Sequence, residues 1–599
     1  MKGTFAAFMS DGYKLGHGDM YADGTEVVSN NLTPRGDKIY RRSCTKYYDG
    51  KLTVIGHQGA VQEIVEMWDY FFKMEKGIAL ARYKLLCDNY FGYEVITVDR
   101  LSALHKLGFL PLEIRTLDEG EKVNMGIPVM TVRNTVNHAF WLVNFLETVL
   151  SNLTWKPSTA ATIAQEYRAM LTDFSLRTGT PVEVVNIQAH NFADRGLSGP
   201  EDASRVGFGH ASSFLGSDSL GAVMYAQNYY KAGNFVSCSV PATEHAVSTS
   251  NILRIEEELR TGEYEFKSGE QGDIYIAMCE GKEDSRLIAE IMFMYELMEK
   301  FPVGILSYVA DSFDFYGLIT RGLPYIKHVI MKRQSNGVTP GRLVIRPDSG
   351  DPLTVLCGVK VHNLPHSTQD VIDECDEAND SLSDIAYEYN KGNEEATFYV
   401  LTTDGDVLEV DASYDYERYY NSWSYCGCSA RVVELTPEQR GAIDILMEIF
   451  GYTVTEKGFK LLDDHIGLIY GDSITTTRCL SILERMEEKG FASGNAMFGI
   501  GSFTYQCVTR DTFGFAVKAT FTRVNGKDIA IFKDPKTDSS KKSAKGLLFV
   551  TKVDGEYVLI DNVSMDKHCS EENLLKVRFI DGQFVNQTSL DVIRSKLMV

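Results

Sequence analysis

From about residue 180 onward, stretches typical of β-strands alternate with stretches typical of helices, and this alternation is the strongest constraint on the fold. The expected strands are 182–190, 306–312, 342–350, 466–473 and 495–502. Helical patterns follow at 200–214, 313–331 and 475–490. Such alternation favours a parallel sheet whose strands are joined by crossover helices. We therefore expect an α/β fold, an irregular TIM-like barrel that occupies residues 136–510.

The expected strands end in Asp, Gly or Ser, which simple packing does not require. In the stretch VIRPDSG (344–350), an apolar run stops at an arginine, a proline and an aspartate. In an α/β barrel the carboxyl ends of the strands converge on one mouth, and that mouth holds the site. Taken alone, the stretch is more simply explained as a strand end capped by a surface ion pair.

The two ends of the chain have a different character and predict a second, mainly β domain. Residues 1–55 and 85–135 are β-rich with helical segments, and 511–599 contains two hairpin patterns. The pairs Asn525-Gly526 and Asp554-Gly555 are hairpin-turn signals. We expect these three segments to fold together.

Residues 360–432 fit neither unit and look like an insertion between two barrel strands. The segment is acidic and rich in tyrosine, and its middle predicts a hairpin with a turn at Asp404-Gly405. We expect a solvated excursion without a catalytic part, although its position would let it reach the site mouth or a dimer edge.

Composition excludes several classes of function. The 599 residues carry a formal charge of −22, which argues against bulk binding to nucleic acid or anionic lipid but allows a small basic pocket. Eleven cysteines include no CxxC pair, so we expect thiols in a reducing cytoplasm. The most apolar stretch, from Ala139, contains Asn and Glu and is too short to span a membrane.

Five short stretches carry residues suited to chemistry. They are HNFADRG (190–196), LGSDSLG (215–221), SVPATEHA (239–246), SYVADSFD (307–314) and VIRPDSG (344–350). Each is weak alone, because a lone histidine or aspartate is more often a packing or capping residue.

Their order and spacing resemble the nicotinamide phosphoribosyltransferases of the type II phosphoribosyltransferase family. The resemblance also covers SDGYKLGH (10–17), YGDSITT (470–476), GIGSFTYQCVTRD (499–511) and FKDP (532–535). It extends over nearly the whole chain except the insertion.

The resemblance implies a reaction of NAD salvage. Nicotinamide would condense with 5-phosphoribosyl 1-pyrophosphate to give nicotinamide mononucleotide and pyrophosphate. The pyridine nitrogen has a free lone pair and needs no general base. The site must instead stack a flat ring, hold the leaving group and exclude water from an oxocarbenium-like ribose.

The resemblance assigns the nicotinamide site to four residues. Phe192 would stack on the ring, with Tyr13 of the other subunit on the opposite face. Asp218 would accept a hydrogen bond from the carboxamide and repel nicotinate. Asp218 could equally cap the helix that follows it. Arg346 would bind the amide oxygen or the pyrophosphate.

The resemblance also implies a histidine that ATP phosphorylates, His245. A carboxylate on its second ring nitrogen would raise its nucleophilicity, and Glu244 and Asp311 are the candidates. Asp348 would hold a ribose hydroxyl and stabilise positive charge at C1′. ATP would be a coupled, optional co-substrate, and Mg²⁺ would bind through the pyrophosphate rather than directly to the protein.

Phosphate groups require backbone N–H groups and cations. The residues expected to bind ribose and its phosphate are Arg195, Ser307, Asp348, Gly471, Asp472, Gly501 and Ser502. Those expected around pyrophosphate or ATP are Arg35, Arg510, Lys518, Lys533 and Lys541. The resemblance brings Arg35, Arg510 and Lys518 from a partner subunit, which implies a homodimer with shared sites. A solvated surface charge is the other explanation for each lysine.

The chain departs from the family pattern at three positions. Asp194 stands where an aromatic is expected, Ser502 replaces a glycine of the phosphate loop, and Ala516 replaces a serine. The last two could weaken phosphate binding or alter the use of ATP. Two other functions stay open: a nicotinate phosphoribosyltransferase, which Asp218 argues against, and a non-catalytic nucleotide-binding relative.

Overall fold

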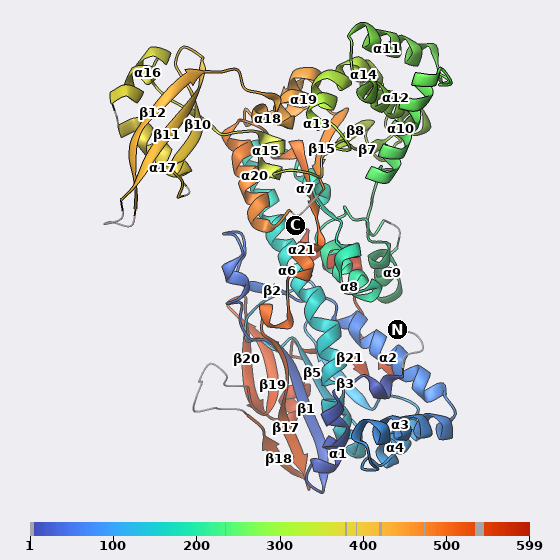
Figure 1. Cartoon of the computed structure of the whole chain (residues 1–599). Helices are drawn as coiled ribbons and strands as arrows, with labels where there is room; N and C mark the ends of the chain where they lie inside the picture. The colour runs from blue at the N-terminus through green and yellow to red at the C-terminus, as the bar shows by residue number, and fades with distance from the viewer. Residues whose placement is uncertain are drawn as a thin grey trace.

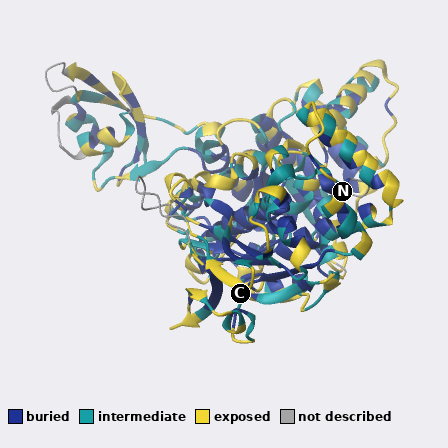
Figure 2. Ribbon diagram, turned by 90° about the horizontal axis from the view of Figure 1, so that it is seen from below, coloured by how far each residue is buried: buried dark blue, intermediate teal, exposed yellow. Residues whose placement is uncertain are grey.

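The structure, a computed structural model, describes residues 5–233, 235–377, 380–390, 392–417, 422–471, 474–532 and 544–598. Two sheets dominate it, and a long helix, α6 (Glu147–Thr178), runs between them (Figure 1). Buried residues fill the centre of the main body, and a smaller group lies inside the projecting insertion (Figure 2). No helix in these ranges combines the length and apolar character that a membrane crossing would need.

The larger sheet is antiparallel and combines both ends of the chain. Its strands, in order, are β18 (Lys527–Ala530), β17 (Phe515–Val524), β1 (Thr25–Pro34), β5 (Met130–Asn134), β3 (Leu112–Thr116), β21 (Lys576–Ile580) and β22 (Gln583–Phe584). N-terminal β1 pairs with C-terminal β17 from Thr25–Val524 to Pro34–Phe515. Asn525 and Gly526 both have positive φ, as a tight hairpin turn between β17 and β18 requires.

Smaller elements complete this part of the molecule. They are the strand pairs β2 (Lys51–Thr53) with β4 (Lys122–Asn124) and β19 (Leu547–Val553) with β20 (Glu556–Val563), and the helices α2 (His57–Lys73), α3 (Lys76–Phe91), α4 (Asp99–Leu107), α5 (Phe140–Phe145), α22 (Met565–Cys569) and α23 (Leu590–Leu597). The expectation that residues 85–135 are β-rich is wrong for their first part. Glu75 caps α3 through the N–H groups of Gly77 and Ile78, and the chain stays largely helical to Leu107.

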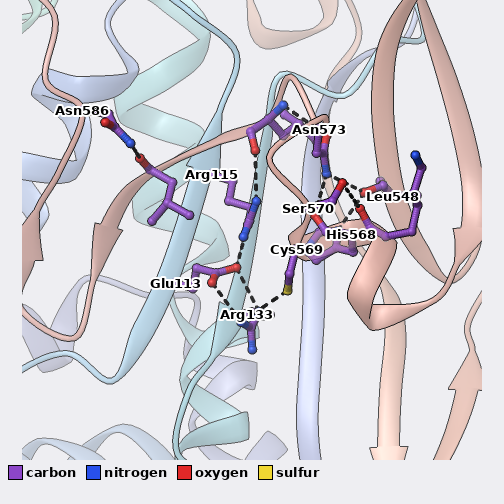
Figure 3. Close-up of polar contacts among 12 residues, drawn as sticks. Glu113, Arg115, Arg133, Leu548, His568, Cys569, Ser570, Asn573 and Asn586 are labelled. Atoms are coloured by element: carbon purple, nitrogen blue, oxygen red, sulfur yellow. Dashed lines mark hydrogen bonds and ion pairs between the residues drawn. The ribbon is translucent and has the colours of Figure 1, made fainter.

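A buried ion-pair cluster ties the strands of the antiparallel sheet together (Figure 3). Glu113 on β3 accepts hydrogen bonds from Arg115 (2.7 Å) and, through two donors, from Arg133 on β5 (2.8 and 3.0 Å). Arg115 also donates to the Leu575 carbonyl at 3.3 Å. We call Glu113, Arg115 and Arg133 the sheet cluster.

The second sheet is parallel and contains the expected strand ends. Its order is β6 (Ala189–Asn191), β16 (Ala496–Ile500), β15 (Ile466–Tyr470), β8 (Arg342–Arg346) and β7 (Ile305–Val309). Helices at its strand connections are α13 (Phe315–Gly317), a short π-helix (Leu318–Gly322), α14 (Leu323–Ile330), α15 (Pro352–Cys357), α18 (Pro437–Arg440), α19 (Ala442–Phe450) and α20 (Thr476–Glu488). The expected parallel α/β sheet is confirmed.

Two expectations about this sheet need correction. The stretch 182–190 is mostly helix α7 (Val182–Gln188), and only its end enters β6. Val185 and Gln188, one helical turn apart, are fully buried, so the apolar run serves a helix face.

The TIM-like barrel is not confirmed, because the regular strands form an open sheet. Between its edges β6 and β7, the described residues contribute only single parallel bridges. These join Asn191 to Ser217, Gly216 to Cys238, and Ala242 to Ser307.

Several helices follow β6 before the chain enters β7. Counting α11 among them, the α-helices that the structure describes in this part are five: α8 (Pro200–Ala211), α9 (Leu220–Tyr229), α10 (His245–Thr261), α11 (Gly269–Glu280) and α12 (Ser285–Lys300). The short α21 (Ser502–Gln506) follows β16.

The insertion is a compact unit that projects to one side (Figure 1). Its sheet runs β12 (Ser422–Val432), β11 (Val407–Glu417), β10 (Glu395–Leu401) and β9 (Val361–Asn363), with α16 (Thr368–Glu377) and α17 (Asp380–Tyr389). The expected hairpin at Asp404-Gly405 joins β10 to β11. Residues such as Leu382, Phe398 and Val410 give the insertion a core of its own.

The two ends of the insertion meet at a pair of glycines. Gly358 and Gly441 both have positive φ. A Cβ on Gly441 would lie 2.3 Å from the Gly358 nitrogen, and one on Gly358 would lie 2.2 Å from the Gln439 carbonyl oxygen. Val359 N donates to the same carbonyl at 2.8 Å. The segment that enters the insertion and the end of α18 that leaves it therefore lie side by side, where only glycine fits.

Candidate active site

Phe192 lies directly after β6 and its ring packs over the neighbouring strand. Its backbone N–H donates to the Ile500 carbonyl at 2.9 Å, which extends the pairing of β6 and β16 by one residue. A Cβ on Gly499 would lie 2.7 Å from the Phe192 ring. Gly499 therefore makes room for a half-buried aromatic face at the strand ends.

Asp218 is oriented beside this ring by two neighbours. His190 Nε2 lies 3.0 Å from Asp218 Oδ1, and the Ser239 hydroxyl donates to the same oxygen at 2.5 Å. The rings of His190 and Phe192 are 4.6 Å apart. Burial alone would raise the pKa of Asp218, but the hydrogen bonds and charge of His190 and Ser239 outweigh it and lower that pKa. Asp218 is thus an ionised carboxylate near an aromatic face.

The sequence also allowed Asp218 to cap the following helix, but the next residue in the chain fills that role. Ser219 is the N-cap of α9, and its hydroxyl accepts from the Ala222 N–H at 3.3 Å. The Asp218 side chain is 48% exposed and is left to face the site.

Arg346 ends β8, and its guanidinium bends toward the mouth of the sheet. Nη2 donates to the Thr243 carbonyl at 2.9 Å, and Nε lies 3.6 Å from Asp348 Oδ1. A Cβ on Gly471, at the end of β15, would overlap Asp348 Oδ1 at 1.9 Å. The arginine and the aspartate are therefore a part-buried pair between two strand ends rather than a surface ion pair.

His245 is the first residue of α10 and faces a buried carboxylate. Its Nε2 lies 3.0 Å from Asp311 Oδ1, and Asp311 Oδ2 accepts the Asp348 N–H at 2.9 Å. Burial would raise the pKa of Asp311, but hydrogen bonds from Ser349, Asp348 and His245 outweigh it and lower that pKa. The His245 side chain is 48% exposed and that of Asp311 only 6%. Asp311 thus fills the role of orienting carboxylate.

These contacts form one continuous group at the carboxyl ends of the parallel strands. We call Phe192, Asp218, His245, Asp311, Arg346 and Asp348 the strand-end network. Four links follow from the distances above, with Phe192 joined to Asp218 through His190, and the charge of Arg346 acting on Asp218 supplies a fifth. Glu244 precedes His245 but is exposed, and its side chain does not cap α10.

The residues expected at the phosphates are dispersed around this group. Arg195 is exposed in a short 3-10 helix (Asp194–Gly196) that lies against Ser502, where a Cβ on Gly196 would meet Ser502 Oγ at 2.1 Å. Gly501 is the N-cap of α21, and Ser502 is its first residue. Ser307 is buried within β7. Asp472, Lys533 and Lys541 lie outside the described residues.

Four expected residues lie away from the strand-end network in the same chain. Tyr13 is 64% exposed and stacks edge-on with His17. The other three belong to the antiparallel sheet or its edge: Arg35 donates to Gly514 O, Arg510 pairs with Asp511, and Lys518 lies 3.8 Å from Glu147. No described contact joins any of them to the network within one subunit.

Some residues of the site have no role in the sequence expectations. His190 lay inside a quoted stretch, two residues before Phe192, and alternation along a strand could have placed both on one face. Ser239 and Thr243 also lay inside a quoted stretch (239–246) but received no role, because their segment has no strand pattern and forms only single bridges.

Comparison with known proteins shows the family of the chain. Residues 187–583 match the nicotinate phosphoribosyltransferase (NAPRTase) family. A protein of Acinetobacter baylyi called nicotinamide phosphoribosyltransferase is 37% identical over 590 residues, 98% of this chain and 96% of that one. One of the same name from Mycoplasma pneumoniae is 26% identical, covering 90% and 93%.

Among solved structures, human nicotinic acid phosphoribosyltransferase aligns with a TM-score of 0.49 at 14% identity, covering 98% of this chain and 92% of that one. The family match covers well over half of the chain, and the Acinetobacter protein is related along nearly all of it. The chain belongs to the nicotinate phosphoribosyltransferase family.

Proposed function

We propose that the protein is a nicotinamide phosphoribosyltransferase, which makes nicotinamide mononucleotide and pyrophosphate from nicotinamide and 5-phosphoribosyl 1-pyrophosphate. The observation that carries this proposal is an ionised Asp218 held beside the Phe192 ring. An anion at that place accepts a hydrogen bond from a carboxamide and repels a carboxylate. Two relatives with the same name as this activity support the choice.

In the proposed reaction the pyridine nitrogen attacks C1′ of the ribose while the bond from C1′ to the pyrophosphate oxygen breaks. The bonding electrons leave with pyrophosphate, and no proton needs to be removed from nicotinamide. Phe192 and Asp218 would hold the ring and its amide. Arg346 would bind the amide oxygen or the leaving group, because a part-buried guanidinium at the strand ends can pair with either.

Asp348 would hold a ribose hydroxyl and stabilise the positive charge that develops at C1′. Mg²⁺ would arrive with pyrophosphate, whose oxygens suit it as ligands. In the described ranges, no group of three His, Cys, Asp or Glu side chains is placed to hold a metal ion.

ATP would transfer its γ-phosphoryl group to His245 and leave as ADP. Because Nε2 faces Asp311, Nδ1 would be the attacking nitrogen, and the Asp311 carboxylate would stabilise the charge that forms on the ring. Replacing His245 by Ala should abolish the stimulation of turnover by ATP and keep the fold. Full stimulation in that variant would remove His245 from the mechanism.

The full site would need a second copy of the chain. Tyr13, Arg35, Arg510 and Lys518 are exposed and remote from the strand-end network of their own subunit. A homodimer would bring them to the partner's network.

Within each subunit, the single bridges between β6 and β7 support an irregular closed barrel. A cytoplasmic location stays a prediction.

Product analysis tests the proposed function directly. The protein is mixed with nicotinamide, 5-phosphoribosyl 1-pyrophosphate and Mg²⁺, with and without ATP, and the products are separated. Nicotinamide mononucleotide and pyrophosphate in equal amounts are expected. In a competition, strong preference for nicotinate would favour the acid-specific activity, and binding without product would favour a non-catalytic relative.

A further inference from the structure

Two loops that carry proposed phosphate ligands meet at one place. The first contains Arg195 in the segment Asp194–Gly196, and the second contains Gly501 and Ser502 at the start of α21. An added Cβ at Gly196 would lie 2.1 Å from Ser502 Oγ, so the loops are in contact. Small shifts between them would change how a phosphate group fits.

A buried lysine on the long helix α6 connects both loops. Lys156 Nζ donates to Asp202 Oδ2 at 2.5 Å and to Gln506 Oε1 at 2.8 Å. Its side chain is 9% exposed. Asp202 lies in the first turn of α8 and Gln506 ends α21, so one ammonium group joins three helices.

The two acceptors of Lys156 also bind the same residue, Ser198 in the Arg195 loop. Asp202 Oδ2 accepts the Ser198 N–H at 3.0 Å, directly after the Arg195 segment. Gln506 Nε2 donates to the Ser198 hydroxyl at 2.8 Å. Lys156, Asp202, Gln506 and Ser198 therefore form a closed hydrogen-bond ring that sets the separation of the two loops.

A second, uncharged contact holds α21 independently. The Tyr505 hydroxyl lies 2.7 Å from His210 Nδ1, and His210 Nε2 lies 3.2 Å from the carbonyls of Ala189 and Gly216. Burial lowers the pKa of His210 to about 3, so this histidine is neutral. Because this contact remains when Lys156 is changed, the loss of Lys156 should loosen the loops without unfolding the helix.

We propose that Lys156 is a positioning residue for the phosphate-bearing substrate. It acts through Asp202 and Gln506, which align the Arg195 loop with the Ser502 loop, and it does not touch the substrate itself. This inference rests on the proposed function, because it assumes that these loops bind the phosphates of 5-phosphoribosyl 1-pyrophosphate.

Three variants test the proposal: Lys156→Met removes the charge, Lys156→Arg keeps a donor for both acceptors, and Gln506→Leu removes one arm of the ring. Lys156→Met should raise the KM for 5-phosphoribosyl 1-pyrophosphate about tenfold, the usual effect of losing a charged hydrogen bond. The KM for nicotinamide should stay within about twofold. Lys156→Arg should restore most of the loss, and Gln506→Leu should show a smaller rise of the same kind.

The control is Arg115→Met, which removes another buried cation that lies far along the chain in the antiparallel sheet. It should lower the melting temperature and leave both KM values unchanged. Equal rises in both KM values, or none, in Lys156→Met would overturn the inference.

Calorimetric titration with pyrophosphate and Mg²⁺ separates this inference from the proposed function. If the wild type makes no mononucleotide, the proposed function fails, and the titration still tests Lys156. Weaker pyrophosphate binding in Lys156→Met than in Arg115→Met supports the positioning role. Equal binding in the two variants, or no binding by the wild type, overturns it.

Discussion

Glu113 in the antiparallel sheet and Asp218 at the ends of the parallel strands are both carboxylates whose pKa is lowered, but they differ in access to solvent. Burial opposes the shift at Glu113, and hydrogen bonds from Arg133 and Arg115 outweigh it. The Glu113 side chain is 5% exposed, whereas that of Asp218 is 48% exposed. Both of Glu113's oxygens bind arginine, whereas His190 and Ser239 both contact Asp218 at Oδ1.

The difference in solvent exposure separates charges that stabilise the fold from charges that can contact a ligand. In the sheet cluster both oxygens of the buried Glu113 carboxylate are bound by arginine, so removing this carboxylate should cost stability. The strand-end network leaves exposed carboxylate and imidazole surface at Asp218 and His245, so its members should affect ligands more than folding. Four changes test this comparison.

Replacing Glu113 by Gln should have the largest effect on stability. Arg115 and Arg133 would be left buried without a countercharge, which typically costs about 3–5 kcal/mol. Urea denaturation measures the change in the free energy of unfolding. Asp528→Asn is the control, because its pair with Arg523 is half exposed and should contribute at most about 1 kcal/mol. A loss from Glu113→Gln no larger than the control would contradict the comparison.

Replacing Arg346 by Met should act on turnover. Removing a donor aimed at developing or transferred charge typically lowers kcat roughly 10²–10³-fold. The melting temperature should fall less than in Glu113→Gln. Arg342→Met is the matched control, since Arg342 lies at the opposite end of β8 and binds Asp464. Kinetics that change equally in the two variants would show that Arg346 acts only through the strand.

A third carboxylate, Glu290 on α12, sharpens the comparison because it is 2% exposed and accepts a hydrogen bond from the Tyr308 hydroxyl. Burial raises the pKa of Glu290 to about 7, with weaker effects from Asp314, Asp284 and Arg286. The unfolded chain loses this proton near 4.5. Stability should therefore fall as the pH rises between these values and level off above 7, by about 3 kcal/mol in total.

Glu290→Gln should remove that part of the pH dependence and preserve the acceptor for Tyr308. Free energies of unfolding at pH 5 and pH 8 would measure it. Identical pH dependence in wild type and variant would mean that Glu290 ionises normally in the folded protein.

Replacing Asp218 by Asn should give the smallest free-energy change. The preference for nicotinamide over nicotinate should weaken by about 1–3 kcal/mol, because a neutral side chain no longer repels the acid. The ratio of kcat/KM for the two substrates measures it. Ser239→Ala, which keeps the carboxylate, should retain most of the preference. An unaltered ratio in Asp218→Asn would exclude Asp218 as the selector.

The sequence predicted the parts of the fold that depend on local pattern. The strands expected at 342–350 and 466–473 and the turn at Asn525-Gly526 follow from apolar runs and turn residues, although the observed strands already end at Arg346 and Tyr470. The helix Val182–Gln188 was missed, because a short apolar run suits a strand or a buried helix equally.

The site could be predicted only in part. Convergence of strand ends placed Asp311 near His245, although 66 residues separate them. It could not show that Ser219 rather than Asp218 caps α9, or that Lys156 reaches Gln506 350 residues away. Such contacts depend on how helices pack, and no local pattern encodes them.

The close contact between Gly358 and Gly441 bears on how the insertion could have been acquired in evolution. Because the two ends of the insertion already lie in contact, the insertion could be gained or lost without separating the strands of the parallel sheet. A short linker in place of residues 360–432 should leave a smaller protein whose parallel strands keep their neighbours.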